Sequence, residues 1–388
     1  MKYDFDTGID RRNTDCVKWD MNNIKFGTDD LLPLWVADMD FKAPPEVTEA
    51  LVKRASHGAY GYTFYPESLY EAVINWEFNR HGWKIRKEWI NFTSGIVPAI
   101  NFFVDCFTVK GDGIVIQTPV YPPFLESCEN NERKLLENRL VESGNSYEID
   151  FDDLEFKLKE AKMMIISSPH NPIGKSFTKE ELRRTAELCI RHNVILISDE
   201  IHQDIIYSGA KHTCTASISN EISQNTITCI APSKTFNLPG LQLSAIIIKN
   251  DNLRNRFSNY IKTKGLEYLN LFGILAGETA YRYGAPWLNE LLKYLEANRD
   301  FAADYIRKNI PGIKPVIPQA TYLMWLDFRS LNLPHNELED VLKYKAKVGL
   351  YSGGYFGTGG QGFMRLNFAC PRSTLEEGLK RIRSGLFN

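Results

Sequence analysis

Lys234 lies where a lysine can do covalent chemistry. It follows the apolar, β-branched run "NTITCI" and precedes the turn signal Pro239-Gly240, so it comes directly after a predicted buried strand. Lysines are mostly solvated, so Lys234 taken alone is most simply a surface residue. An amine at the end of a strand can instead attack an aldehyde and form a Schiff base. Other residues of the chain distinguish between these two interpretations.

Three more polar side chains follow predicted strands. Tyr121 comes after "GIVIQTPV", Asn171 after "MMIISSPH", and Asp199 near the end of "VILISDE". Each has a purely structural alternative, namely aromatic packing, a turn residue before proline, and an acid that caps a helix. Ligands of parallel α/β sheets bind beyond the carboxyl ends of the strands. We therefore expect these three side chains and Lys234 to converge on one crevice.

This set of side chains suits pyridoxal 5'-phosphate (PLP). An aspartate that faces the pyridine nitrogen keeps it protonated, because a nearby negative charge favours the cationic form. The protonated ring then stabilises a carbanion at the substrate Cα. A tyrosine can stack on the ring, and an asparagine amide can donate to its phenolate oxygen. The sequence therefore predicts PLP as the cofactor.

A phosphate group needs backbone N–H donors, which the start of a helix provides. In "NFTSGIVPAINFFVDCF", Thr93, Ser94 and Gly95 precede an apolar helical run. Glycine lets the backbone approach a ligand closely, although Gly95 could simply start the helix. Ser233, next to Lys234, can add a hydroxyl. We expect the phosphate to bind here.

The elements that must position these residues alternate between strand and helix. Strands are predicted at 114–117 and 163–167, and a helix follows Thr178, with Glu181 completing a capping box. Strand, helix, strand in this order predicts parallel pairing in a layered domain. After about residue 285 long helices alternate with strands at "ATYLMWLDF" and "GFMRLNFAC".

The predicted fold class is α/β. It comprises a large PLP-binding domain, with a mostly parallel sheet in an α/β/α layer, and a smaller α+β domain. We expect residues 1–48 to form an N-terminal segment that packs with the small domain, residues 49–285 the large domain and residues 286–388 the small one. The Gly-rich segment 351–362 lacks a phosphate-loop pattern and is expected to be a mobile loop near the substrate.

Composition excludes several functional classes. The net charge is −2 and the pI about 6.4, so no strong field favours nucleic acid or an anionic membrane. There is no signal-peptide pattern, and no apolar run long enough to span a bilayer. Seven cysteines without a C-x-x-C pair indicate reduced thiols and a cytoplasmic location. The seven histidines are scattered without H-E-x-x-H, so no metal site is expected.

Four segments together resemble a known superfamily. "TPVYPPF", "SSPHNPIGK", "ISDEIHQDI" and "APSKTFNLPGLQ" are similar to the fold-type-I PLP enzymes of the aspartate aminotransferase superfamily, in the same order, from about Trp35 to Arg365. "PLWVADMDF", "YGYT" and "LPGLQ" resemble its cystathionine β-lyase / cysteine C–S lyase branch. Many aminotransferases of the superfamily carry a phosphate-binding arginine where this chain has Gln242, which also resembles the lyase branch.

The resemblance implies a role for each matching residue. Lys234, Tyr121 and Asp199 are implied as catalytic residues, and Lys234 as the one that bonds to PLP. The implied cofactor contacts are Lys234, Gly95, Ile96, Tyr121, Asn171, Asp199, His202, Ser233 and Tyr62. His202 is implied to support Asp199, and it could equally be a structural histidine. Tyr62 is implied to reach the phosphate in the neighbouring subunit, which implies a homodimer.

The substrate contacts follow from the same resemblance. Arg365 is implied to clamp the substrate α-carboxylate, a group that guanidinium binds bidentately, although an arginine can also form a structural ion pair. Asn171 and Trp35 are the other implied substrate contacts, and Trp35 could equally be packing.

The resemblance implies α,β-elimination from a small amino-acid substrate. L-Cystathionine or a related cysteine S-conjugate would yield a thiol (homocysteine), pyruvate and ammonia. Lys234, with its pKa lowered, would remove the α-proton. The alternative is a PLP-dependent aminotransferase, which uses the same residues; Gln242 and "WVADMDF" favour the lyase. A non-catalytic PLP-sensing regulator usually needs a DNA-binding module, for which the chain leaves no room before residue 33, and its charge is not basic.

Overall fold

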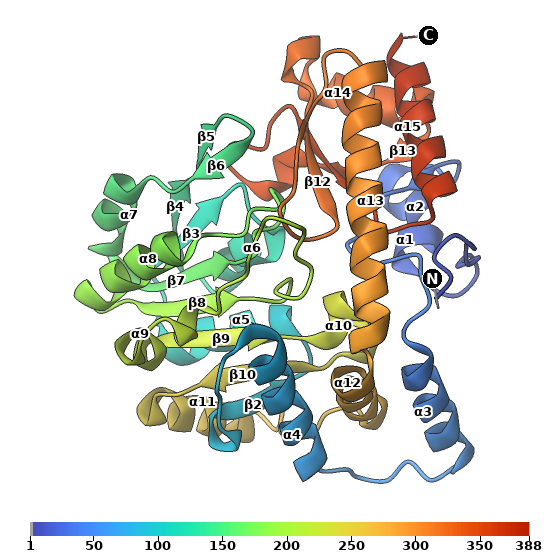
Figure 1. The fold of residues 1–388 in the computed structure, drawn as a ribbon. Helices are drawn as coiled ribbons and strands as arrows, with labels where there is room; N and C mark the ends of the chain where they lie inside the picture. Colours follow the sequence, from blue (N-terminus) through green and yellow to red (C-terminus); the bar gives the residue numbers. More distant parts are fainter. Residues whose placement is uncertain (1–2, 388) are drawn as a thin grey trace.

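A seven-stranded sheet forms the centre of the large domain in the computed structural model, which describes residues 3–387 (Figure 1). Across the sheet the strands are β2 (Ile90–Thr93), β10 (Ser244–Ile248), β9 (Thr226–Ile230), β8 (Ile195–Asp199), β7 (Ala161–Ser167), β3 (Gly113–Thr118) and β4 (Lys134–Arg139). The pairs from β9 to β4 are parallel. β10 is antiparallel to β2 and β9.

Helices cover both faces of this sheet, as predicted. Successive strand residues point to opposite faces: Ile114 and Ile116 pack in one core with α5, α6 and α11, and Val115 packs in another with α7 and α8. The bounds of these helices are α5 (Ile96–Phe107), α6 (Pro122–Asn130), α7 (Phe151–Leu158), α8 (Lys179–Arg191) and α11 (Asp251–Thr263). The predicted capping box of α8 is present, with Thr178 and Glu181 each bonding the other's backbone.

A smaller antiparallel sheet lies near the carboxyl-terminal end of the chain. Its strands are β11 (Lys314–Val316), β12 (Leu323–Asp327), β15 (Phe363–Asn367) and β14 (Tyr351–Ser352), in that order. The long helix α13 (Ala285–Asn309) runs beside α15 (Arg372–Phe387) in Figure 1. Between β12 and β14, the helix α14 (His335–Asp340) continues as the π-helical turn η6 (Val341–Lys345). These observations confirm the predicted α/β fold class with a second, smaller sheet.

The N-terminal segment joins this smaller sheet region. α1 (Val17–Asp20) and α2 (Asn22–Phe26) lead into β1 (Leu32–Pro33), which pairs in parallel with β13 (Val348–Gly349). The domain boundaries after residues 48 and 285 stay a prediction.

Shorter elements complete the described chain. They are α3 (Pro45–Ser56), α4 (Glu67–Trp76), η1 (Glu77–His81), η2 (Lys87–Trp89), β5 (Val141–Ser143), β6 (Ser146–Glu148), η3 (Thr215–Ser217), α9 (Asn220–Asn225), α10 (Pro232–Thr235), η4 (Pro239–Leu241), α12 (Leu271–Tyr283), η5 (Arg329–Leu331) and η7 (Gly353–Phe356). Between residues 3 and 387, no helix has the length and apolar character needed to cross a membrane. All seven cysteines are free and buried.

Candidate active site

A cavity of about 260 Å³ opens at the carboxyl ends of the parallel strands. The predicted site residues that line it are Gly95, Ile96, Tyr121, Asn171, Asp199, His202, Ser233 and Lys234. They come from segments as far apart as the β2–α5 turn and α10. The parallel strands bring them together, as the sequence predicted.

Lys234 lies on the one-turn helix α10, which directly follows β9. Its Nζ donates a hydrogen bond of 2.6 Å to the carbonyl oxygen of Ala37. Burial lowers the pKa of Lys234 to about 8, and the Arg365 cation adds to this effect, while Asp38 and Asp199 oppose it. A substantial fraction of this amine is therefore neutral, and so nucleophilic, near neutral pH.

Asp199 ends β8 as a buried carboxylate. Its Oδ1 accepts a hydrogen bond of 3.1 Å from the Ile201 N–H. Burial, mainly, raises its pKa to about 7, with Glu200 contributing. A cation placed in the cavity beside Asp199 would offset this burial and favour the ionised carboxylate. The position therefore fits a protonated ring nitrogen.

His202 lines the same cavity and is buried. Its Nδ1 has no hydrogen-bond partner within residues 3–387, and its ring meets that of Tyr322 edge-on at 6.0 Å. Burial, together with the charges of Lys234 and Arg365, holds its pKa well below the ordinary value. His202 is therefore neutral, and it does not contact Asp199 through any hydrogen bond in the described chain.

Arg365 lies on β15 of the smaller sheet, behind Asn171, which lines the cavity. Its Nη1 donates to Asn171 Oδ1 and its Nη2 to the Trp35 carbonyl oxygen, each at 2.9 Å. Its Nε is buried without a partner in the part of the chain that the structure describes. Burial lowers the pKa of Arg365 to about 10, so the group stays cationic at neutral pH. A buried cation with an unused donor fits a carboxylate ligand.

The turn between β2 and α5 fits a phosphate group. Gly95 is the N-cap of α5 and has φ +137°, a conformation that side-chain-bearing residues rarely adopt. Ser94, Ser233 and Gln242 also line this part of the cavity. The first N–H groups of α5 lack helical partners, so they are available to an anion.

Known proteins place the chain in a family. The model of the family "Aminotransferase class I and II" matches residues 15–382. The chain belongs to this family. It is 46% identical to the cystathionine beta-lyase PatB of Bacillus subtilis (strain 168) over 384 residues, which cover 98% of this chain and 99% of that protein. The superfamily predicted from the motifs is thereby confirmed.

Solved structures agree with this assignment. A PLP-bound putative aminotransferase from Clostridium difficile 630 matches with a TM-score of 0.98 and 44% identity, over 99% of this chain and 100% of that one. Cystalysin from Treponema denticola, whose structure contains PLP, matches with a TM-score of 0.96 and 39% identity, over 100% of this chain and 99% of that one.

Three predicted site residues do not line the cavity: Arg365, which bonds the lining residue Asn171, and also Tyr62 and Trp35. Tyr62 is fully exposed, with its ring 6.2 Å from that of Tyr268. Trp35 is buried, and its ring packs against Phe26 at 5.5 Å and Tyr351 at 6.1 Å. Trp35 thus contributes its carbonyl to Arg365 rather than its ring to the cavity. The roles assigned to these residues stay predictions.

No sequence motif predicts the contribution of Ala37. Its carbonyl oxygen accepts from Lys234 Nζ at 2.6 Å and from the Tyr322 hydroxyl at 2.9 Å. A backbone acceptor can belong to any residue type, so no motif marks it.

A buried charge cluster anchors the residues that follow Ala37. Lys18 is fully buried and pairs with Asp40 at 2.6 Å, and Arg11 bonds both Asp38 and Asp40. Burial alone lowers the pKa of Lys18, but the carboxylates, Asp40 foremost, outweigh it and raise that pKa. The two acids in "ADMD" were the available signal for this cluster.

Replacing Lys18 by methionine is expected to lower the free energy of unfolding by about 3 kcal/mol. Removing one partner of a buried ion pair leaves the other charge uncompensated, which costs about 3–5 kcal/mol. We expect the lower end because Arg11 still pairs with Asp40 at 2.9 Å. Urea unfolding measures the change, with the exposed Lys42→Met as control. Equal unfolding midpoints for the two variants would contradict the prediction.

Proposed function

We propose that this protein is a PLP-dependent C–S β-lyase. It cleaves L-cystathionine or related cysteine S-conjugates, with consumption of one water, to a thiol, pyruvate and ammonia. The observation that carries the proposal is that Lys234, Asp199 and Asn171 line one cavity, with Arg365 bonded to Asn171. The likeness to the cystathionine beta-lyase PatB along nearly the whole chain supports elimination. The alternative is an aminotransferase, which keeps the Cβ substituent and transfers the amino group to a 2-oxo acid.

The cavity residues fit PLP. Lys234 would hold its aldehyde end until a substrate amine replaces the lysine, Asp199 would face the ring nitrogen, and Tyr121 would lie on the ring face. The N–H groups at the start of α5, with Ser233, hold the phosphate. When bound, PLP draws electrons away from the substrate Cα.

The side chains around it bind the substrate and move its proton. Arg365 binds the α-carboxylate through its unused Nε and orients the substrate Cα toward Lys234. The Lys234 amine, with its pKa near 8, takes the proton from Cα. Loss of that proton allows the bond between Cβ and sulfur to break, and a thiolate leaves readily. Burial of Arg365 and Asp199 excludes water from the groups that orient the substrate.

The proposed enzyme is a cytoplasmic homodimer. Tyr62 is fully exposed and lies among the exposed aromatic residues Tyr60, Phe64 and Tyr268. Such a cluster suits a protein interface, and in the dimer Tyr62 would reach the phosphate in the neighbouring subunit. The seven buried, free cysteines suit a reducing compartment.

Covalent capture of PLP by the apoprotein is expected to accelerate as the pH rises through about 8. The nucleophile is the neutral Lys234 amine, whose pKa is about 8, so the rate should fall below this pH and level off above it. Stopped-flow absorbance measures the rate. A rate that keeps rising to the pKa of an ordinary lysine, about 10.4, would contradict the lowered pKa.

The reaction itself is tested by loading the purified protein with PLP and adding L-cystathionine. Pyruvate and free thiol are followed together, with Lys234→Ala as control. Equal amounts of both products, abolished by the substitution, are expected. Amino-group transfer to a 2-oxo acid without pyruvate would establish the aminotransferase instead.

A further inference from the structure

Lys25 of α2 is a half-buried cation that lies against aromatic rings. Its Nζ is 4.2 Å from the centroid of the Tyr355 ring and 5.2 Å from that of Tyr351. Within residues 3–387 no carboxylate forms an ion pair with it. Burial lowers the pKa of Lys25 below its ordinary value, with Glu339 opposing. Ring faces compensate a desolvated ammonium only in part, so this cation can still accept an anion.

The Tyr351 ring connects Lys25 to the active site. Tyr351 pairs with Arg365 across β14 and β15, and the Arg365 guanidinium carbon is 4.9 Å from the centroid of the same ring. Lys25 and Arg365 therefore both contact Tyr351. Arg365 is the arginine proposed to bind the α-carboxylate, so Lys25 lies one aromatic ring away from one end of the substrate.

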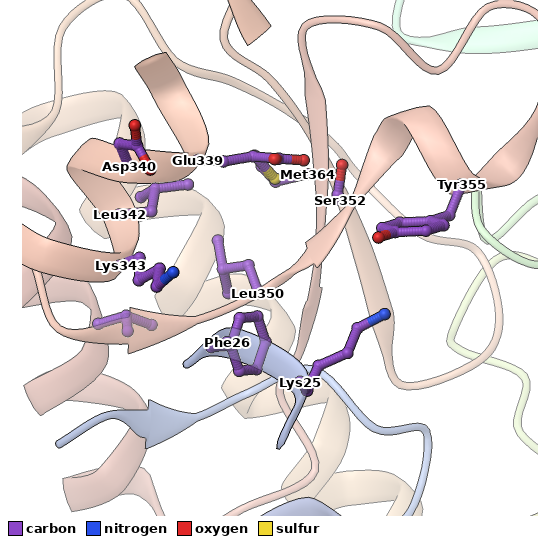
Figure 2. Close-up of a pocket in the computed structure, with 11 residues that line it drawn as sticks. Lys25, Phe26, Glu339, Asp340, Leu342, Lys343, Leu350, Ser352, Tyr355 and Met364 are labelled. Carbon is purple, nitrogen blue, oxygen red and sulfur yellow. The ribbon is translucent and has the colours of Figure 1, made fainter. Parts of the chain in front are cut away.

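A second cavity, of about 140 Å³, lies next to Lys25 (Figure 2). Phe26, Leu342, Leu350 and Met364 give it apolar walls, and Glu339, Ser352 and Tyr355 add polar atoms. Figure 2 shows the Lys25 ammonium directed toward Tyr355. The cavity offers apolar surface for a hydrocarbon chain together with charges of both signs.

This cavity lies beside the edge strand of the smaller sheet. Ser352 pairs with Met364 next to the Tyr351–Arg365 pair, and successive side chains of a strand point to opposite faces. The cavity therefore lies on the face opposite Arg365. β14 is the edge strand of this sheet, so Lys25 contacts Tyr351 on one face while it lines the cavity on the other.

His335 fixes the polar wall of the cavity. Its Nδ1 accepts from the Gly362 N–H at 3.1 Å, so its Nε2 carries the proton. Nε2 lies 2.8 Å from Ser352 Oγ and 3.3 Å from a Glu339 carboxylate oxygen. The Glu339 carboxylate is thereby positioned in the wall of the cavity that Lys25 also lines.

We propose that Lys25 determines specificity by binding a carboxylate at the far end of the thioether, beyond the sulfur. This inference rests on the proposed lyase function. L-Cystathionine carries a second amino-acid group at that end: its carboxylate would meet Lys25, and its ammonium would face Glu339. Arg365 and Lys25 then bind the two carboxylates of one substrate on either side of Tyr351. A cysteine S-alkyl conjugate has no carboxylate beyond the sulfur for Lys25 to bind.

The test compares L-cystathionine with S-propyl-L-cysteine, which has a similar thioether chain but no distal charge. Lys25→Met is expected to weaken L-cystathionine binding about 10-fold, which is what loss of one charged hydrogen bond produces. Binding of S-propyl-L-cysteine should be unchanged. For L-cystathionine, the Lys25→Met variant should show a higher KM and an unchanged kcat, because the contact lies away from Cα. The apparent Kd is read from the absorption band of bound PLP, independently of pyruvate release.

Two further variants separate recognition from folding. Lys25→Arg keeps the charge and should stay within about threefold of the wild type. Lys343→Met removes the other lysine that lines the cavity. It should leave the Kd of both substrates unchanged. An equal loss for both substrates, or no loss for L-cystathionine, would overturn the proposal. If the selective change in Kd appears while no pyruvate forms, the lyase function fails and the role of Lys25 stands.

Discussion

Lys234→Ala is expected to lower kcat for β-elimination by about 10⁴-fold, the upper end of what a positioned general base provides. The variant loses both the bond to PLP and the base that takes the Cα proton. His202 lines the same cavity, but its pKa lies well below the ordinary value, so it is too weak a base to replace the amine. A kcat within tenfold of the wild type would contradict the role of Lys234.

A chemical measurement separates this role from a folding defect. Borohydride reduction of the loaded wild type should attach PLP permanently to the peptide that contains Lys234, and mass spectrometry detects it. Lys234→Ala should give no such adduct, and added methylamine should restore part of its activity. Lys211→Ala, at an exposed lysine, is the matched control and should behave as the wild type.

Asp199→Asn is expected to lower kcat by about 10³-fold, as loss of a positioned electrostatic group does. The amide has the shape of the carboxylate but no charge, so it no longer favours the protonated ring nitrogen. Asp199→Glu keeps the charge and should retain more activity than the amide variant. If the asparagine variant were as active as the wild type, Asp199 would not be the partner of the ring nitrogen.

The same substitution has a second expected effect, on Lys234. The Asp199 charge raises the pKa of Lys234 and so opposes the effect of burial. With the charge removed, that pKa should fall below about 8, and PLP capture should reach half its maximal rate at a lower pH than in the wild type. The stopped-flow pH profile measures this shift. An unchanged profile would show that the two groups do not interact.

The sequence predicted the parts of the site that the strand pattern determines. Asp199 and Lys234 follow β-branched runs, and the carboxyl ends of parallel strands meet at one edge, so their convergence could be expected. The antiparallel direction of β10 includes its pairing with β2, which comes from a distant part of the chain. Periodicity alone does not carry that information.

The contacts that a pattern could not predict are those of the backbone and of distant pairs. The Ala37 and Trp35 carbonyls hold Lys234 and Arg365, and any residue type supplies a carbonyl. The local sequence predicts Lys25 to be an ordinary surface lysine on a short polar helix. Its position over Tyr351 arises from the packing of α2 against the smaller sheet, which no local signal encodes.

The pairing of the N-terminal segment with the end of the chain affects when the site can form during synthesis. The Trp35 carbonyl bonds a residue 330 positions later, and the Ala37 carbonyl one 197 positions later. Contacts of such long sequence separation form late in folding, and the ribosome adds residues from the N-terminus. The Trp35 carbonyl must therefore wait for its partner until Arg365 has emerged. Before then a nascent chain can complete the parallel strands of the large sheet and bond Lys234 to Ala37, but it cannot yet place its arginine.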